Sequence, residues 1–221
     1  MALNQGELIR RIASVVGHEL RNPLAVINNS AYFVKTKLFQ GKLDAKVEKH
    51  LGIIAAEVAR ADKIIGRMVA YSRPIEFKAT SGSLAACVEA ALAEAPLPDG
   101  VTLDKKLKDV MLALDVALVT QAARDLIDNA VEAMDGKGRL SVAVGLAGGR
   151  PELRVADSGP GLPAGKEKDI FEPFFTTKPK GLGLGLASAH RTAEAHGAVL
   201  SAEKGPGGGA VFRLVWPACG K

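Results

Sequence analysis

The feature that most constrains this chain is a heptad pattern of apolar residues in its first third. The apolar side chains are separated by alternating steps of four and three residues, at Val47, Leu51, Ile54, Val58, Ala61, Ile65 and Met68. This spacing places them along one stripe of an α-helix and is typical of coiled coils and helical bundles. A preceding segment with helical periodicity, from about residue 3 to residue 39, predicts a first helix. Residues 40–42 then predict a turn, in which Gly41 can end the first helix, and Asp44 is a candidate cap for the second.

Two helices of this length form a hairpin that buries only one of its faces. An apolar stripe with nothing else to pack against favours pairing with a second copy of the chain, which gives a four-helix bundle. We therefore predict that residues 1–76 form an antiparallel helical hairpin and that the protein is a homodimer.

The character of the sequence changes after Pro74. Residues 77–83 predict a linker, and residues 84–221 predict a second domain. Short β-type runs are expected at 101–107, 110–114, 140–146, 152–156, 199–203 and 211–216, with helices at 84–94, 115–134 and about 184–196. Strands interleaved with helices indicate an α/β sandwich. The predicted fold class is thus multidomain, a helical hairpin forming a dimeric four-helix bundle, followed by an α/β sandwich.

The composition indicates the cellular compartment in which the chain folds. The two cysteines, Cys87 and Cys219, are far apart and outside any CxxC pattern, so they form neither a zinc site nor a disulfide framework. A reducing compartment is the natural setting. No stretch approaches the roughly 20 apolar residues that a membrane helix needs. We expect a cytoplasmic chain without membrane contact, the excised core of a longer kinase, with the cytoplasmic part of a longer sensor protein as one form of it.

The positive charge is concentrated in the first third. Residues 1–78 hold 13 Lys and Arg against 7 Asp and Glu, a net of +6, and residues 79–221 hold 16 against 17, a net of −1. The basic residues are dispersed and few aromatic side chains accompany them, so no nucleic-acid partner is predicted. A solvated helix surface is the favoured interpretation, and docking of an acidic protein is the alternative.

Three glycine-rich clusters occur in the second domain, at residues 157–161 (DSGPG), 181–186 (GLGLGL) and 205–209 (GPGGG). Glycines let backbone amides approach an anion closely, and a helix that starts at such a cluster adds a favourable dipole. Each cluster alone is weak evidence for a phosphate-binding site, because β-turns also use glycine. Residues 205–209 alone indicate a hairpin loop.

The order of the motifs is more specific than any one of them. Asp128-Asn129-Ala130 lies in a predicted helix and is followed by DSGPG, then by residues 171–175 (FEPFF), then by GLGLGL. This order resembles the N, G1, F and G2 boxes of the ATP-binding domain shared by histidine kinases, gyrase, Hsp90 and MutL, over roughly residues 80–217. The resemblance implies that the cofactors are ATP and Mg²⁺.

The resemblance also assigns roles to individual residues. Asn129 would present its side-chain oxygen to Mg²⁺, which prefers hard oxygen ligands. Asp157 would accept a hydrogen bond from the adenine amino group, and Gly159 and Gly161 would line the pocket. The other implied nucleotide-binding residues are Lys178, at the terminal phosphates, and the lid residues Gly181, Gly183, Gly185 and Leu186.

Two departures from the family pattern stand out. The segment between residues 175 and 181 is short, which resembles the lid of soluble nitrogen-regulation-type kinases. Asp125, one turn before Asn129, stands where histidine kinases often have Asn and the related ATPases have a water-activating Glu. A carboxylate there favours slow ATP hydrolysis or a water-mediated hold on Mg²⁺, and the alternative is an ordinary helix-surface residue.

The first predicted helix contains the sequence HELRNPL at residues 18–24, which resembles the H-box of histidine kinases. Residues 71–74 resemble the end of their second helix. The resemblance implies that His18 is phosphorylated from ATP and passes the phosphoryl group to an aspartate on the receiver domain of a response regulator. A neutral imidazole is a nucleophile near pH 7, and Glu19 is the candidate general base. The resemblance implies that Asn22 orients a water molecule for dephosphorylation of the partner. The alternative is that Asn22 helps to end the helix before Pro23.

The main competing hypothesis is an ATPase or conformational switch of the same nucleotide fold, in which His18 is not phosphorylated. Asp125 favours it and the intact HELRNPL opposes it. A second alternative is a non-enzymatic scaffold that binds nucleotide and partners. The presence of both Asn129 and Asp157 opposes that reading.

Overall fold

The computed structural model of the protein describes residues 5–39, 45–94, 96–178, 181–205 and 207–218, without the side chains of residues 5–15, 18 and 39. The described residues divide into two compact units. One is drawn from Met1–Pro74 and Thr176–Leu184, and the other from Ile75–Phe175 and Gly185–Lys221.

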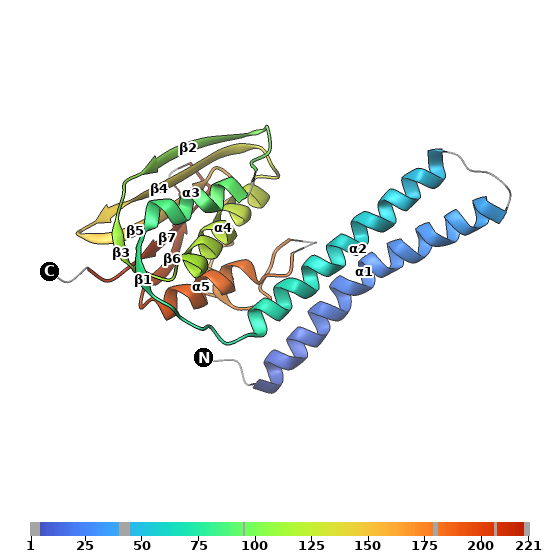
Figure 1. The fold of residues 1–221 in the computed structure, drawn as a ribbon, viewed down its shortest axis with the longest axis horizontal. Helices are drawn as coiled ribbons and strands as arrows, with labels where there is room; N and C mark the ends of the chain where they lie inside the picture. Colours follow the sequence, from blue (N-terminus) through green and yellow to red (C-terminus); the bar gives the residue numbers. More distant parts are fainter. Residues whose placement is uncertain (1–4, 40–44, 95, 179–180, 206, 219–221) are drawn as a thin grey trace. The chain divides into compact units, whose positions relative to one another are not determined.

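The first unit contains an antiparallel hairpin of two long helices, α1 (Gln5–Phe39) and α2 (Ala45–Ser72) (Figure 1). Both predicted helices are thereby confirmed, and α1 continues through Pro23. The predicted turn at 40–42 and the predicted cap at Asp44 lie outside the described residues. Neither of these helices, nor any other in the described ranges, combines the length and the apolar character needed to cross a membrane.

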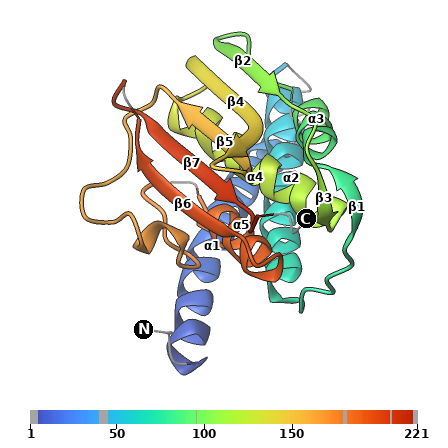
Figure 2. The ribbon, with the colours of Figure 1, turned by 90° about the vertical axis from the view of Figure 1, so that its left-hand side faces the viewer.

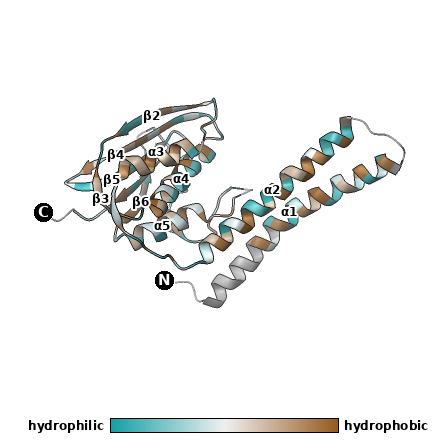
Figure 3. Ribbon diagram, in the orientation of Figure 1, coloured by the Kyte–Doolittle hydropathy of each residue, from teal (hydrophilic) through white to brown (hydrophobic). Residues whose placement is uncertain are grey.

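The heptad pattern of α2 is only half covered within the chain. Val47, the first residue of the pattern, is 2% exposed. Ile54, Ala61 and Met68, which follow it at intervals of seven, are half-buried. The alternate members of the same pattern, Leu51, Val58 and Ile65, are 50%, 52% and 47% exposed. Figure 3 shows apolar residues recurring along both helices of the hairpin. One stripe of α2 is thus covered in this chain, and a second apolar stripe faces solvent.

A polar and aromatic contact fixes the pairing of the two helices. His50 of α2 lies with its Nδ1 atom 3.2 Å from the hydroxyl of Ser30 in α1, and its ring stacks on Phe33 at a centroid distance of 4.1 Å. Ser30 is 4% exposed, so its hydroxyl needs a partner inside the hairpin. These contacts define one register between α1 and α2.

The second unit is built on a five-stranded sheet with the order β2-β4-β5-β7-β6, in which β2 and β4 are parallel and the other neighbours are antiparallel. A separate antiparallel pair joins β1 and β3. The strands are β1 (Thr80–Ser83), β2 (Val101–Leu107), β3 (Met111–Leu114), β4 (Gly138–Ala147), β5 (Arg150–Asp157), β6 (Val199–Lys204) and β7 (Ala210–Val215). Figure 2 shows the sheet from its open side, with the helices behind it.

Three α-helices cover one face of this sheet: α3 (Leu84–Glu94), α4 (Val116–Ala133) and α5 (Gly185–Ala195) (Figures 1 and 2). A short 3₁₀ helix, η1 (Asp169–Phe171), precedes the lid region. The arrangement confirms the predicted α/β sandwich. Residues 80–83, which the sequence assigned to a linker, instead form β1, and the Ser83 hydroxyl accepts a hydrogen bond from the Ala86 N–H at the start of α3.

The core of the sandwich lies between the sheet and the helices. Alternate residues of β4 and β5 point into it, among them Leu140, Val142, Leu153 and Val155, all fully buried. Alternation of buried and exposed positions is expected for strands with one covered face. The sheet therefore presents a continuous apolar surface on which α4 packs.

Asp115 ties the segment that precedes β1 to the start of α4. One carboxylate oxygen, Oδ1, accepts the Leu118 N–H at 3.1 Å and caps α4, and Oδ2 accepts the Lys78 N–H at 2.9 Å. The N–H of Asp115 donates to Nε2 of His196 at 2.9 Å, so this histidine carries its proton on Nδ1, 2.7 Å from the Thr192 carbonyl. Burial raises the pKa of Asp115, but the backbone hydrogen bonds outweigh burial and leave the pKa below its ordinary value.

Replacement of Asp115 by Ala is expected to lower the free energy of unfolding of the second unit by about 0.5–2 kcal/mol, because the helix cap is lost. The lowered pKa of Asp115 means that its stabilisation is present above the unfolded-state value of 3.8 and is lost as the pH falls through the folded-state value. The difference between wild type and variant should therefore shrink below about pH 4. Urea unfolding followed by the fluorescence of Trp216, the single tryptophan, measures it.

The matched control is Asp99→Ala, which removes an exposed carboxylate from the turn before β2. This control should leave the free energy of unfolding unchanged at pH 7 and at pH 3. A loss at Asp115 that is the same at pH 7 and at pH 3 would contradict the assignment of the effect to the ionised carboxylate.

Candidate functional site

Helix α4 places the predicted metal ligand at the centre of the second unit. Asp125, Asn129 and Ala133 are spaced by four residues, so they share one stripe of the helix. Asp125 is 8% exposed and Asn129 is half-buried. The same helix buries Leu126 and Ile127 completely against the core, which fixes the orientation of this stripe.

The glycine-rich turn after β5 packs directly on the C-terminal end of α4. A Cβ atom on Gly159 would lie 3.0 Å from the carbonyl oxygen of Ala133. Asp157, the last residue of β5, begins this turn, and its Oδ1 atom accepts the Gly159 N–H at 2.8 Å and the Ala210 N–H at 3.2 Å. The adenine-binding candidate is therefore held at a defined place beside α4.

The N-terminus of α5 lies near the middle of α4. A Cβ atom on Gly185, the first residue of α5, would be 3.8 Å from the Oδ1 atom of Asp125. The first N–H groups of a helix have no partner within the helix, and with the helix dipole they favour an anion. The stripe on α4 thus runs from the start of α5 at Gly185, past Asn129, to the turn that begins at Asp157.

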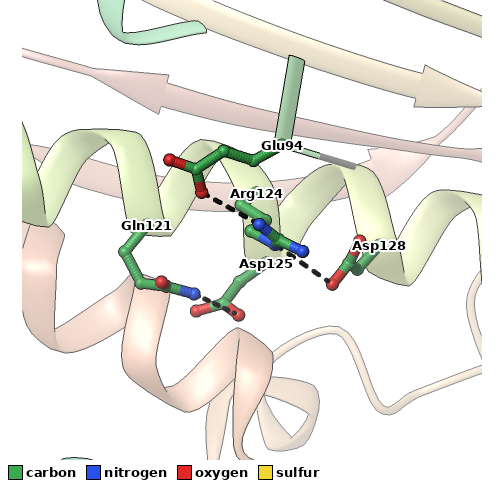
Figure 4. Close-up of polar contacts among 5 residues, drawn as sticks. All are labelled: Glu94, Gln121, Arg124, Asp125 and Asp128. Carbon is green, nitrogen blue, oxygen red and sulfur yellow. Dashed lines mark hydrogen bonds and ion pairs between the residues drawn. The ribbon is translucent and has the colours of Figure 1, made fainter. Parts of the chain in front are cut away.

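The two carboxylates of α4, Asp125 and Asp128, have different polar partners (Figure 4). The Gln121 side-chain amide donates to Oδ1 of Asp125 at 3.2 Å. Arg124 forms an ion pair with Glu94 of α3 at 2.9 Å and lies 3.9 Å from Asp128. These ion pairs are partly exposed and contribute little to stability, but they direct Asp128 toward Arg124.

The donor set around Asn129 fits Mg²⁺ bound together with a nucleotide. Mg²⁺ commonly takes one or two protein oxygens and completes its shell with phosphates and water. Within the described ranges, no group of three His, Cys, Asp or Glu side chains could hold a metal alone. A single amide oxygen near an anion-binding helix start matches a metal that arrives with its phosphates.

The remaining predicted nucleotide-binding residues divide between the two units. Leu186 belongs to α5, where its side chain packs against the core, so its backbone is the part available to a ligand. Lys178, Gly181 and Gly183 belong to the first unit. There the Lys178 N–H donates to the Thr176 hydroxyl at 3.0 Å and the Gly181 N–H donates to the Lys178 carbonyl at 3.3 Å.

The hairpin carries the predicted phosphoacceptor residues on α1. The backbone of His18 is helical, and its side chain lies outside the described part of the structure. Glu19 is 7% exposed, and its carboxylate lies 3.7 Å from the guanidinium of Arg60 in α2. Asn22 is exposed.

Sequence reasoning missed the partner residues in both units. Arg60 and Gln121 lie in ordinary helical segments, and their pairing with Glu19 and Asp125 depends on helix register or packing. Gly209 and Ala210 were also missed as partners of Asp157. Here a signal existed, since a run of glycines in a loop indicates a close backbone approach.

Comparison with known proteins finds two family matches along the chain. Residues 8–76 match the family described as the His Kinase A (phospho-acceptor) domain. Residues 114–219 match the family described as histidine kinase-, DNA gyrase B- and HSP90-like ATPases. The two matches together cover both the hairpin and most of the α/β sandwich.

Curated relatives share the whole length of the chain. The sensor histidine kinase ZraS of Klebsiella oxytoca is 33% identical over 218 residues, which are 95% of this chain and 46% of ZraS. The sensor protein FixL of Bradyrhizobium diazoefficiens is 34% identical over 222 residues, 94% of this chain and 43% of FixL. The chain thus spans less than half the length of these relatives.

Solved structures show the same fold. The histidine kinase ThkA, crystallised in complex with the response regulator protein TrrA, matches 94% of this chain and 61% of its own with a TM-score of 0.77 at 24% identity. The mycobacterial sensor histidine kinase MprB matches 63% of this chain and 97% of its own with a TM-score of 0.58 at 23% identity.

The contact between the turn after β5 and the loop before β7 can be tested with two glycines. Gly161 and Gly165 have φ values of +82° and +71°, so an alanine at either position pays a similar backbone cost of about 1–2 kcal/mol. A Cβ atom on Gly161 would lie 2.3 Å from the Gly208 carbonyl, whereas one on Gly165 would meet nothing within 4 Å. We expect Gly161→Ala to lose more unfolding free energy than Gly165→Ala and to weaken nucleotide binding, which Gly165→Ala should leave unchanged. Urea unfolding and calorimetric titration measure the two effects, and equal losses in both variants would refute the contact.

Proposed function

Because the chain belongs to the sensor histidine kinases, with a phospho-acceptor hairpin followed by their ATP-binding domain, we propose that it uses ATP to phosphorylate His18. The phosphoryl group then passes to an aspartate on a response regulator. The observation that carries the proposal is the set of groups gathered along α4: the start of α5 for phosphates, Asn129 for Mg²⁺ and Asp157 for adenine.

Each part of the nucleotide has a recognition group in this chain. Oδ2 of Asp157 accepts from the adenine amino group, while Gly159 and Gly161 leave room for the base. The backbone amides of Gly185 and Leu186 bind phosphate oxygens at the start of α5. Lys178, Gly181 and Gly183 are assigned to the terminal phosphates by the family resemblance alone. Asn129 would hold Mg²⁺, which would offset phosphate charge and position the phosphates for in-line transfer.

The chemistry at His18 is a simple displacement. A neutral ring nitrogen attacks the γ-phosphorus, a P–N bond forms, and the bond to the bridging oxygen breaks so that ADP leaves with the electron pair. The opposite ring N–H becomes more acidic as positive charge develops, and Glu19 accepts its hydrogen bond or its proton. Arg60, 3.7 Å from Glu19, orients that carboxylate from the neighbouring helix.

A response-regulator receiver domain is the proposed acceptor protein. The relative ThkA was crystallised with such a protein. The net charge of +6 on residues 1–78 favours the approach of an acidic surface and raises the association rate. Asn22 is exposed one turn after His18, where its amide could orient a water for dephosphorylating the partner. We place these reactions in the cytoplasm.

The exposed apolar stripe of α2 supports a homodimer. Leu51, Val58 and Ile65 repeat every seven residues on one side of α2, and Leu24 and Leu38 of α1 are 53% and 50% exposed. Large side chains in such a row are destabilising in water and favour association. A second hairpin that covers them would complete a four-helix bundle.

Hydrolysis of ATP without phosphorylation of His18 is the second candidate function, and Asp125 is the observation that favours it. Its buried carboxylate lies beside the start of α5, where the phosphates are proposed to bind, and Gln121 fixes the orientation of Oδ1. A carboxylate in that place could activate a water for attack on the γ-phosphate.

Incubation with γ-labelled ATP and Mg²⁺ tests the principal function. We expect acid-labile, alkali-stable label on the wild-type protein and none on His18→Ala. Glu19→Gln should slow labelling by about 10²–10⁴-fold if it is the general base. The control is His50→Gln, which removes the other histidine of the hairpin, keeps a side chain that can hydrogen-bond to Ser30, and should keep the label. Absence of label together with release of phosphate that Asp125→Asn abolishes would establish the ATPase instead.

Association is tested by a charge in the exposed stripe. Val58→Glu should convert the dimer to a monomer in light scattering at micromolar concentration, because a carboxylate would be buried without a partner. Ala56→Glu is the matched control, since residue 56 is exposed and lies about 200° around the helix from residue 58. A Val58→Glu protein that remains dimeric would place the interface elsewhere.

A further inference from the structure

We propose that the end of the loop between β6 and β7, at Gly209 and Ala210, positions Asp157 and thereby sets the preference for adenine over guanine. The inference rests on the proposed role of Asp157 in binding adenine. It adds a role for Gly209 and Ala210, two residues that need not touch the nucleotide themselves.

The backbone of the loop lies directly on the backbone of Asp157. A Cβ atom on Gly209 would be 1.9 Å from the carbonyl oxygen of Asp157 and 2.9 Å from its Oδ1 atom. Real Cβ atoms do not approach other heavy atoms so closely, so a side chain at this position must displace one of the two segments. Gly209 itself is buried.

Hydrogen bonds fix the rotation of the Asp157 carboxylate. The Ala210 N–H and the Gly159 N–H both donate to Oδ1, at 3.2 and 2.8 Å. Among the residues that the structure describes, none donates to Oδ2. One oxygen therefore holds the side chain in place, and the other remains an acceptor for a ligand.

Backbone hydrogen bonds join the described residues of this loop. The Gly205 N–H donates to the Gly209 carbonyl at 2.6 Å, and the Gly208 N–H donates to the Gly205 carbonyl at 3.0 Å. Gly208 also lies against the turn after β5, since a Cβ atom on Gly161 in that turn would be 2.3 Å from the Gly208 carbonyl oxygen. The support for Asp157 is thus preformed.

A fixed acceptor discriminates between the two purines. Adenine offers an exocyclic amino group where guanine has a carbonyl, so an immobile Oδ2 would face a second acceptor when guanine enters. A site built around one hydrogen bond rejects a base that cannot make it. A carboxylate that could rotate would instead reach the N–H donors that guanine carries nearby. Rigidity at Asp157 is therefore the source of the selectivity.

Two glycines of the same loop provide the test. Gly209→Ala should weaken ATP binding by at least about tenfold and reduce the ratio of ATP to GTP affinity, because displacement of a binding group by about 1 Å has effects of this size. Gly207→Ala is the control: residue 207 is exposed, and a Cβ there meets nothing within 4 Å. Affinities for both nucleotides are measured by calorimetric titration with Mg²⁺ on the full chain.

The readout separates positioning from folding. Circular dichroism establishes that each variant is folded, and a general loss of structure would weaken ATP and GTP equally without changing their ratio. Where Gly209→Ala does not fold, Ala210→Pro removes the N–H donor at the first position of β7, a site that tolerates proline, and should lower the same ratio. A folded variant with the wild-type ratio overturns the proposal. A wild-type protein that binds both nucleotides equally would instead refute the role of Asp157 itself.

Discussion

The packing of α4 against the sheet and against α5 is the constraint on which the second unit depends. Leu126 and Ile127 are completely buried, and this burial decides which stripe of the helix faces the ligand. The same helix meets Gly185 near its middle and Gly159 at its end. A shift of α4 along the sheet would therefore move Asn129 away from the proposed phosphate and adenine positions, whatever the identity of the side chains.

Backbone groups, more than side chains, shape the proposed nucleotide site. Asp157 is held by two N–H groups, and the start of α5 offers several more. Such groups need close approach, and the glycines at 159, 161 and 209 supply it because a Cβ at any of them would crowd a carbonyl oxygen. Backbone donors also lose no side-chain entropy on binding, so the site is organised before the ligand arrives.

The hairpin, unlike the α/β sandwich, leaves part of its apolar surface exposed, because two helices alone cannot cover all of their apolar residues. Val47 is buried within the chain while Val58 is half exposed, although both belong to one heptad pattern. The covered stripe holds the hairpin together, and the open stripe is available for association. Glu19 and Arg60 meet across the covered side, so the register that buries Val47 also orients the proposed general base.

Local pattern by itself determined the helices, the strands and the identity of the candidate residues, because periodicity, glycine clusters and the order of HELRNPL, Asn129 and DSGPG are properties of neighbouring positions. Strand β1 escaped prediction, since a four-residue polar segment becomes a strand only when β3 offers it a partner. The same holds for Arg60 with Glu19, Gln121 with Asp125, and Gly209 with Asp157. These pairings depend on helix register, packing of the side chains, and the approach of segments about 50 residues apart, which only the tertiary structure decides.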